Sequence, residues 1–414
     1  MKNRPWVWVI VFLVLSLCID LYYYHKVSLS SADDPWQICY SDFKVFYTTA
    51  REFYLRFLND PAYGPVDKRY GPIYDFTKEF YHFRYSPFVV YLFMPLCRIP
   101  MGVALLVWTF ILNILFLMSF ILLAKVFGDG SARTTVLLSI ACVAVLRFYF
   151  NNIALGQTDA VIAFLWCLFL YFFVRELTVP GAVTFALIVQ FKPFFLPVLA
   201  YFILSKRWRL ALYSVLAFEV FLFIPVIKTG YAEVTSLAYD WARMINSSIG
   251  SQIGNPKNQS LVHFILQLTG RGDNERLVYL VSGVSYLVSL SLLALMRSLV
   301  SKQDRGPFRT FEVSFFLLAV LLSSPLIWKA AFISAIIPVS YILFSPGRRI
   351  WRILSLVFLA LFIVFTSMLS PDMLKIFSYK ASEDIKFIPI GASFLFISLI
   401  LLYLEKYHTM KVKL

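Results

Sequence analysis

The sequence has few charged residues and few residues that bind metals. Asp, Glu, Lys and Arg make up only 15% of its 414 residues, and there are four His and five Cys. These His and Cys residues show no metal-ligand spacing, so we expect no metal site. No segment is long and polar enough to form a separate soluble domain. The sequence therefore predicts a single integral membrane unit over residues 1–414.

Several sequence signals of soluble enzymes and nucleic-acid-binding proteins are also missing. No P-loop and no glycine-rich dinucleotide fingerprint is present, so we expect no bound nucleotide and no other cofactor. The net charge of +15 would suit nucleic acid, but no basic stripe interleaved with polar residues accompanies it. Nucleic acid is therefore not an expected partner, and the charge is better explained by membrane topology.

Apolar runs are what the sequence does have: 60% of the residues are hydrophobic and the mean hydropathy is +0.75. This composition is typical of an all-α polytopic membrane protein. The runs predict a bundle of about 12 transmembrane helices, some short or broken, the first with no cleavage site after it. They lie at Val7–Tyr24, Met101–Ala124, Thr134–Phe150, Thr158–Val174, Gly181–Phe191, Phe194–Leu204, Trp208–Ile227, Leu277–Met296, Phe311–Ile327, Ala330–Phe344, Trp351–Leu369 and Ile388–Leu404.

Two long polar stretches, residues 25–98 and 228–276, interrupt the apolar runs and are expected to be large extracytoplasmic loops carrying interfacial helices. The segment Pro87–Cys97 is apolar, but as a helix it would be only about 16 Å long against a hydrocarbon core of about 30 Å. We therefore interpret it as a helix on the membrane surface, with a short spanning segment as the alternative.

Positive charge favours a cytoplasmic N-terminus, because short cytoplasmic connections carry the excess of Lys and Arg. On this topology the cytoplasmic connections and C-terminal tail hold Lys125, Arg133, Arg175, Lys206, Arg207, Arg209, Arg297, Lys302, Arg305, Arg309, Arg348, Arg349, Arg352, Lys406, Lys411 and Lys413. Lys375, Lys380 and Lys386 in the last outer connection are exceptions. The first loop, "LGQTD" (155–159), "FKPF" (191–194), the second loop and "SSPLIWK" (323–329) then share the outer face.

Lys192 lies in the middle of an apolar stretch and is followed by Pro193. A lysine at membrane depth costs about 2.5–3.5 kcal/mol on insertion scales, so an anionic partner is expected. A phosphate would suit this buried point charge, and the proline would interrupt the helix beside it. The alternative is a lysine whose ammonium reaches the membrane interface.

Asp42, in "CYSDFKVFY", lies among aromatic residues shortly after the first predicted helix. Reduced solvation at a membrane surface would raise the pKa of its carboxyl group and make it a stronger base. It could instead be a solvated loop residue paired with Lys44 or Arg51.

Four further groups carry polar side chains on the expected outer face, and three of them have a structural alternative. Gln157 and Asp159 could bind a sugar or simply belong to a helix cap. Arg84 and Tyr85, in "FRYSPF", could contact a phosphate or a sugar, or anchor the chain at the interface. Asn258, Gln259 and Ser260 suit sugar hydroxyls but also suit an ordinary turn. Trp328 precedes Lys329, which could be a second cation for a phosphate.

Taken in order, the first-loop Asp, the "RYSP" element, "GQ", "KP", "NQS" and "SPLIW" resemble the polyprenol-phosphate-sugar-dependent glycosyltransferases of family 87, which include α-mannosyltransferases and have the C-type (GT-C) membrane fold. The resemblance implies that Asp42 is the general base, that Lys192 faces the lipid phosphate of the donor and that Gln157 lies at the sugar pocket. It implies that residues 258–260 lie near donor or acceptor. Family members often carry His shortly after the "SPxxW" tryptophan, whereas this chain has Lys329 there, which puts the identity of donor or acceptor in doubt.

The function expected from this resemblance is an inverting transfer of a sugar, mannose or another hexose or pentose, from a polyprenyl phosphate to a lipid-linked or glycan acceptor. The expected location is the bacterial inner membrane with the site facing outward, in contact with membrane lipid. The single prominent Asp suits one inverting displacement better than a paired-carboxylate scheme. A transporter or a flippase for lipid-linked oligosaccharides is the alternative, favoured by the many helices and the broken one. The missing inverted repeat argues against it, and a scaffold role would leave Lys192 unexplained.

Overall fold

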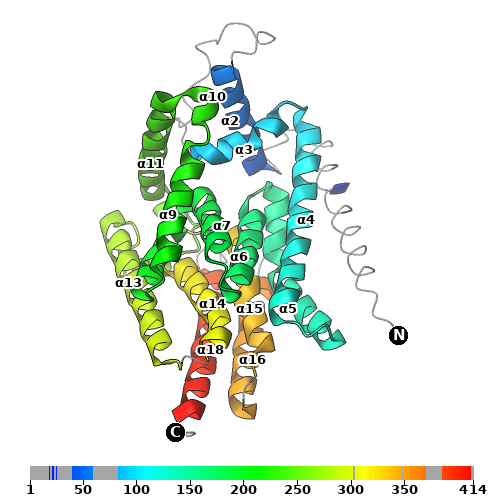
Figure 1. The fold of residues 1–414 in the computed structure, drawn as a ribbon, viewed down its shortest axis with the longest axis vertical. Helices are drawn as coiled ribbons and strands as arrows, with labels where there is room; N and C mark the ends of the chain where they lie inside the picture. Colours follow the sequence, from blue (N-terminus) through cyan, green and yellow to red (C-terminus); the bar gives the residue numbers. More distant parts are fainter. Residues whose placement is uncertain are drawn as a thin grey trace.

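The computed structural model describes residues 18, 21, 22, 25, 40–58, 83–301, 304–346, 348–369 and 385–411. Within these ranges the chain forms helices and no β-strand. The first predicted helix, Val7–Tyr24, lies almost wholly outside them, and so do Lys302, Lys375, Lys380 and Lys413 of the charge analysis. Figure 1 shows an elongated bundle in which most helices run along the long axis.

Seven helices in the described part of the chain are long and apolar enough to cross a membrane. They are α4 (Met101–Phe127), α5 (Ala132–Leu155), α9 (Trp208–Phe223) with its short continuation α10 (Val226–Thr229), α13 (Glu275–Leu299), α14 (Arg305–Ser323), α16 (Arg349–Ile363) with a π-helical turn at Val364–Met368, and α18 (Phe387–Lys411). Shorter apolar helices complete the bundle: α3 (Pro87–Cys97), α6 (Asp159–Val174), α7 (Thr178–Phe191), a 3₁₀ turn (Pro193–Phe195) with α8 (Val198–Leu204), and a 3₁₀ segment (Lys329–Ala335) with α15 (Ile336–Phe344).

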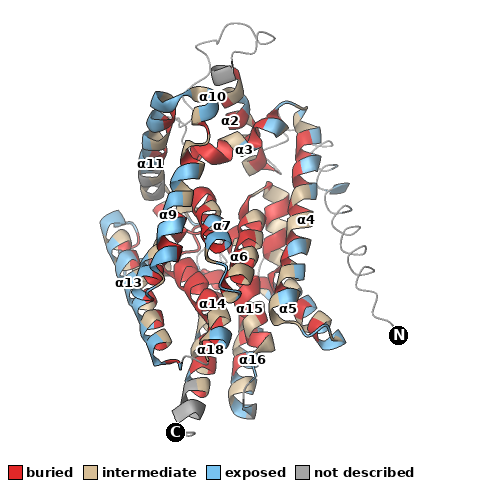
Figure 2. Ribbon diagram, in the orientation of Figure 1, coloured by how far each residue is buried: buried red, intermediate tan, exposed pale blue. Residues whose placement is uncertain are grey.

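The outer surface of the bundle is apolar, which requires lipid around it. On α13, Leu280, Val284, Leu287 and Val288 form one helical stripe, each with more than half of its surface exposed. The exposed residues of α9 and α13 lie along the outside of the bundle in Figure 2, whereas the interior is buried. Exposed apolar stripes of this length are not compatible with water and match a hydrocarbon environment. The protein is therefore an all-α polytopic membrane protein, as predicted.

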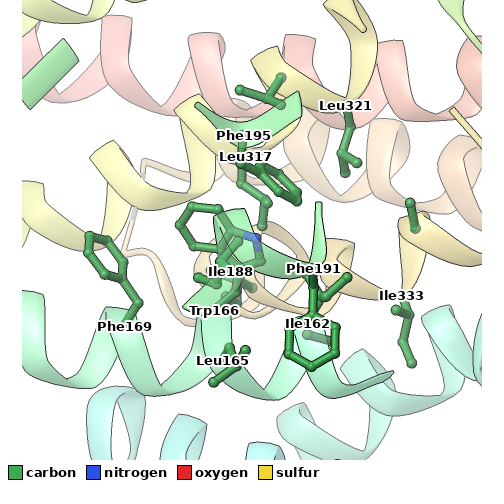
Figure 3. Packing of buried hydrophobic residues seen from close by; sticks show 14 of the residues in the cluster. Ile162, Leu165, Trp166, Phe169, Ile188, Phe191, Phe195, Leu317, Leu321 and Ile333 are labelled. Carbon is green, nitrogen blue, oxygen red and sulfur yellow. The ribbon is translucent and has the colours of Figure 1, made fainter. Parts of the chain in front are cut away.

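The core behind the site is aromatic and comes mainly from α6, α7, the turn at Pro193–Phe195 and α14. Trp166 lies at its centre, with its ring 5.0 Å from that of Phe195 and 5.6 Å from that of Phe316. Figure 3 shows Ile162, Ile188, Phe191 and Leu317 around the same point. The rings of Trp166 and Phe195 meet edge to face and those of Trp166 and Phe316 are tilted, and such aromatic contacts add to the packing energy. This core holds α6 and the break after α7 in fixed positions.

Four helices cover one end of the bundle: α2 (Ser41–Leu58), α3, α10 and α11 (Tyr231–Ile253), all near the top of Figure 1. In that view α3 lies crosswise to α4, the arrangement expected of an interfacial helix. Helix α11 buries one stripe, formed by Val234, Leu237, Trp241 and Met244. The spacing of three and four residues is that of a helix with one face on the protein. Both long polar segments thus contain helices.

Proline explains where the observed helices depart from the predicted ones. The helix predicted over 311–327 ends at Ser323, because Ser324 precedes Pro325 and adopts extended backbone angles. The run predicted over 194–204 is divided by Pro197 into the 3₁₀ turn and α8. Lys386, an exception to the charge pattern, is only 1% exposed and donates a hydrogen bond to the carbonyl of Pro256. Its charge is therefore satisfied inside the protein.

Candidate functional site

Asp42 lies in the first turn of α2, where free backbone amides favour a carboxylate. Phe43, Phe46, Ala50 and Phe53 are buried and follow at helical spacing, so α2 packs its apolar face onto the bundle. The start of the helix is fixed separately by the backbone amide of Tyr40, which donates a 2.7 Å hydrogen bond to the carbonyl of Ala154 at the end of α5. Asp42 is thereby held beside the α5–α6 connection.

Gly156 permits this close approach. It ends α5 with φ of +66°, in the left-handed region, and a Cβ atom built on it would lie 2.5 Å from the Cβ atom of Phe43. Its carbonyl accepts a 3.0 Å hydrogen bond from the indole of Trp108 on α4. Only glycine meets both conditions, the positive φ and the contact with α2. The "LGQTD" stretch therefore turns sharply beside the first turn of α2, which carries Asp42.

The Asp42 carboxylate accepts a 2.5 Å hydrogen bond from the side-chain amide of Gln157. Burial raises the pKa of Asp42 above its ordinary value, Gln157 and the cations Lys192 and Arg84 lower it, and Asp159 raises it further. The net direction is upward. Asp42 is thus a poorly solvated carboxylate with a strengthened affinity for a proton, as predicted from its aromatic neighbours, and the structure pairs it with Gln157.

Lys192 stands at the break between α7 and the following 3₁₀ turn. Its extended backbone (φ −140°, ψ 91°) is the conformation expected before proline, and Phe191 and Phe195 on either side are buried in the aromatic core. The Lys192 ammonium lies 3.5 Å from a carboxylate oxygen of Asp159, whose side chain is 2% exposed against 15% for the lysine. Asp159, which begins α6, is therefore the protein's own counter-ion for this buried cation.

Tyr85 and Arg84 close the site from the segment before α3. The Lys192 ammonium lies 5.7 Å from the centre of the Tyr85 ring, a cation–π distance, and the Tyr85 hydroxyl accepts a 3.1 Å hydrogen bond from Thr158. Burial raises the pKa of Tyr85 and lowers that of Arg84. The carbonyl of Arg84 accepts a 3.1 Å hydrogen bond from Trp241 of α11, so the covering helix fixes this segment.

Besides Oδ2 of Asp159, which lies 3.5 Å from the Lys192 ammonium, two polar atoms of the predicted site residues that the structure describes are buried and have no hydrogen-bond partner: Nε of Arg84 and Oε1 of Gln157. Buried polar groups are nearly always paired, so such atoms need an explanation. One is a donor and the other an acceptor, and both belong to the group around Asp42. They are the atoms that a bound polar molecule would satisfy.

The side chains of the "NQS" element, residues 258–260, form hydrogen bonds with several backbone segments around them. Asn258 is fully buried; its amide donates to the carbonyls of Ile253 (3.0 Å) and Pro325 (3.1 Å), and its oxygen accepts from the amides of Ser260 and Ile327. Ser260 caps α12 (Leu261–Leu268) and donates a 2.6 Å hydrogen bond to Ser324. The Gln259 amide donates at 3.3 Å to Lys257. Asn258 and Ser260 thus position the stretch that leads to Trp328 and Lys329.

Asn152, which sequence reasoning missed, connects the two halves of the site. This fully buried residue of α5 accepts a 3.0 Å hydrogen bond from the amide of Ala160 at the start of α6. Its own amide donates at 3.3 Å to the carbonyl of Ala330, next to Lys329. The sequence signal for this role was weak, because an Asn near the end of an apolar helix usually indicates a helix cap. Asn152 brings "LGQTD" and "SSPLIWK" to the same end of the bundle.

All the predicted site elements therefore gather at one end of the bundle. Asp42, Arg84, Tyr85, Gln157, Asp159 and Lys192 form one connected group, and residues 258–260, Trp328 and Lys329 form a second group beside it. No group of three or more His, Cys, Asp or Glu side chains that could hold a metal ion occurs in the part of the chain that the structure describes. What the arrangement offers is a base of raised pKa close to a buried cation.

Among protein families, the model of glycosyltransferase family 87 fits residues 83–325, more than half of the chain. No curated protein matches. The matched range contains Arg84, Tyr85, "GQTD", the "KP" break and "NQS", whereas Asp42, Trp328 and Lys329 lie outside it. Family membership implies glycosyltransferase activity. The chain belongs to glycosyltransferase family 87, as its motifs predicted.

Proposed function

We propose that this protein transfers a sugar from a polyprenyl-phosphate donor to a hydroxyl group of a lipid-linked or glycan acceptor, with inversion at the anomeric carbon. One observation carries the proposal: Gln157 and Asp159, two residues apart, contact the Asp42 carboxylate and the Lys192 ammonium respectively. A carboxylate and a cation are thus held by the same short turn, at one end of an apolar bundle. A lipid phosphate carrying a sugar would reach both.

The reaction needs one displacement. The acceptor oxygen attacks the anomeric carbon as its proton passes to the Asp42 carboxylate, a carbon–oxygen bond forms, and the bond from the anomeric carbon to the phosphate oxygen breaks. The prenyl phosphate leaves with the bonding electron pair. The raised pKa of Asp42 favours its role as the proton acceptor, and one displacement inverts the configuration.

Lys192 would stabilise the charge on the leaving phosphate. Its present partner is Asp159 at 3.5 Å, longer than a charge-assisted hydrogen bond, so a phosphate oxygen could approach the ammonium while Asp159 keeps the lysine charged and in place. Arg84, with its unpartnered Nε, would supply a second contact, and Lys329 a third. These roles match the charge that develops on a departing phosphate.

The sugar and acceptor would lie among the remaining polar groups. Oε1 of Gln157 has no partner and would accept a hydrogen bond from a sugar hydroxyl while the amide of the same side chain holds Asp42. Tyr85 and Trp328 offer aromatic faces, and the partly used amide of Gln259 lies at the second group of the site. Asn258 and Ser260, whose polar atoms are occupied, would act through the position of residues 323–329.

We place the site on the outer face of a bacterial inner membrane, in a GT-C arrangement. Support comes from the distribution of charge: the short connections at the end of the bundle away from Asp42 carry most of the cations, as cytoplasmic ends do. Lys386, the described exception, is buried against Pro256 and adds no exposed charge to the site end. Mannose is the first sugar to test, with other hexoses and pentoses beside it.

Purified protein in proteoliposomes, supplied with polyprenyl-phosphate mannose and a panel of lipid-linked acceptors, tests the proposal. We expect a glycosylated product of inverted configuration from the wild type, none from Asp42→Asn, and wild-type yield from the control Asp240→Asn, which alters an acidic residue of α11. Mass spectrometry of the lipid-linked glycans that accumulate in a deletion strain identifies the natural acceptor. Uptake of a solute without chemical conversion would instead establish a transporter.

A further inference from the structure

A second polar site lies at the opposite end of the bundle from Asp42. A cavity of about 520 Å³ opens there between the C-terminal end of α6, the start of α7, the start of α9, the end of α13 and the first turns of α14. Helix α6 reaches from Asp159 to Phe173 in the cavity wall, which is about 21 Å at the rise of an α-helix. The cavity is therefore separate from the proposed sugar-transfer site.

Five basic side chains line this cavity, against one acidic side chain. The bases are Lys206, Arg207, Arg209, Arg297 and Arg309, and the acid is Glu176. Cations gathered around one cavity repel one another unless anions neutralise their charge. Acidic side chains of the protein itself neutralise only part of this charge.

Glu312 on α14, which is fully buried behind the cavity, neutralises part of this positive charge. Its carboxylate accepts hydrogen bonds from Arg207 (2.8 and 3.1 Å) and from Arg297 (2.8 Å), and Tyr201 donates to it as well. Outside this network, the exposed carboxylate of Glu176 forms an ion pair with Arg309 and so neutralises one more of the five cations. This network fixes α9, α13 and α14 against one another and leaves two exposed cations at the cavity mouth, Lys206 and Arg209.

The mouth of the cavity also carries apolar side chains that face outward. Trp208, between the two exposed cations, is 60% exposed, and Leu177 on the facing wall is 44% exposed. Val179 and Leu204 nearby are 55% and 47% exposed. A tryptophan beside cations at the end of apolar helices is typical of the membrane interface. The rim therefore suits a molecule with an anionic head and apolar tails better than a free anion.

We infer that this cavity is a binding site for the phosphodiester headgroup of an anionic phospholipid, held by Lys206 and Arg209 with Trp208 against its acyl chains. Basic hollows between transmembrane helices bind such headgroups elsewhere. The Glu312 network explains why the hollow is preformed: its guanidinium groups are already oriented. The inference uses no part of the proposed sugar-transfer reaction.

Native mass spectrometry of the full-length protein in neutral detergent tests this inference, with phosphatidylglycerol, phosphatidylcholine and inorganic phosphate titrated separately. We expect phosphatidylglycerol to bind in preference to phosphatidylcholine, and the double variant K206Q/R209Q to weaken that binding on the order of tenfold. The matched control is K125Q/R133Q, which removes two exposed cations from the α4–α5 connection outside the cavity. Equal losses in the two double variants, or no preference between the lipids, would overturn the inference.

A second variant distinguishes a lipid from a free anion. Trp208→Ala keeps the cations and removes the apolar rim, so we expect weaker phosphatidylglycerol binding from it. If inorganic phosphate bound as well as phosphatidylglycerol, and Trp208→Ala left both unchanged, the cavity would be a site for soluble anions and the lipid assignment would be wrong. Thermal unfolding of each variant shows that its fold is retained, since the buried Glu312 network is unaltered in all of them.

Discussion

The side chain of Gln157 donates a 2.5 Å hydrogen bond to the carboxylate of Asp42 across 115 positions of sequence. Two residues after Gln157, Asp159 holds the Lys192 ammonium at 3.5 Å. One turn between α5 and α6 thus sets the position of both the proposed base and the proposed phosphate-binding cation. The site depends on the geometry of that turn as much as on the two charged residues.

Replacing Asp42 with Asn should remove activity without loss of stability. A general base contributes about 10²–10⁴-fold to rate, so we expect the turnover number to fall by that range. Because burial raises the pKa of Asp42, the folded state binds a proton more tightly than the unfolded state does. Ionisation therefore costs stability as pH rises from the unfolded pKa through the folded one, and Asn avoids this cost.

Thermal unfolding at neutral pH checks the stability half of this prediction, with sugar transfer measured on the same preparation. We expect an unfolding temperature equal to or above that of the wild type. An active Asp42→Asn enzyme would remove Asp42 from the reaction. An inactive variant of clearly lower stability would indicate a structural role instead.

The pH profile of activity should shift in opposite directions when Lys192 or Asp159, the two members of the ion pair, is replaced. Because Asp42 must be ionised to act as a base, kcat/KM should rise with pH through its raised pKa. Lys192 lowers the pKa of Asp42 and Asp159 raises it. Lys192→Met should therefore shift the acid limb of the profile to higher pH, and Asp159→Asn to lower pH. Shifts in the same direction would show that another group controls the limb.

The Lys192–Asp159 pair should separate a structural effect from a donor-binding effect. Lys192→Met leaves the Asp159 carboxylate, 2% exposed, without its counter-ion, and breaking such a pair costs about 3–5 kcal/mol. The double variant Lys192→Met/Asp159→Asn removes both charges and should recover most of the stability. Donor KM should stay raised in both, because the phosphate has lost its cation. Wild-type donor KM in the double variant would refute the phosphate role of Lys192.

Sequence patterns predicted most of the described helices, because helices depend on local rules, and they named the segments that the structure gathers at one end of the bundle. Long apolar runs specify membrane helices, and a mid-membrane "KP" predicts a break and a functional cation; the structure places Lys192 at that break. The partner of Lys192 was harder to predict. Asp159 read equally well as a sugar ligand or as part of a helix cap, and only the packing of α6 against α7 makes it a counter-ion.

The roles within "NQS" could not be divided from sequence, since three neighbouring polar residues have the same local signal. All three are buried, but their side-chain partners divide them: the side chains of Asn258 and Ser260 bond the backbone of residues 324–327, whereas the Gln259 side chain bonds Lys257 and only its backbone amide donates to Ile327. Asn152 was missed for a related reason. Its side-chain partners outside α5 are backbone groups of Ala160 and Ala330, which carry no sequence signal.

Substituting Gly156 should inactivate the enzyme while every charged residue is left in place. Alanine there has a strained positive φ, costing about 1–2 kcal/mol, and its Cβ would meet that of Phe43 at 2.5 Å. We expect α2 to shift, so that Asp42 loses the Gln157 contact and turnover falls by at least tenfold. The control is Gly270→Ala at the end of α12, with φ of +70° and no atom within 4 Å of the added Cβ. It carries the strain without the contact and should keep its activity.

Asn258 and Gln259 should respond differently to alanine, which tests the division of roles in the second group. Asn258→Ala leaves the buried carbonyls of Ile253 and Pro325 and the amides of Ser260 and Ile327 without partners. At about 1–3 kcal/mol for each unsatisfied buried group, the loss of stability should be large. Gln259→Ala removes one 3.3 Å contact to Lys257, so stability should hardly change. If Gln259 binds sugar or acceptor, its KM for one substrate rises, whereas an unchanged KM for both substrates would leave it outside the pocket.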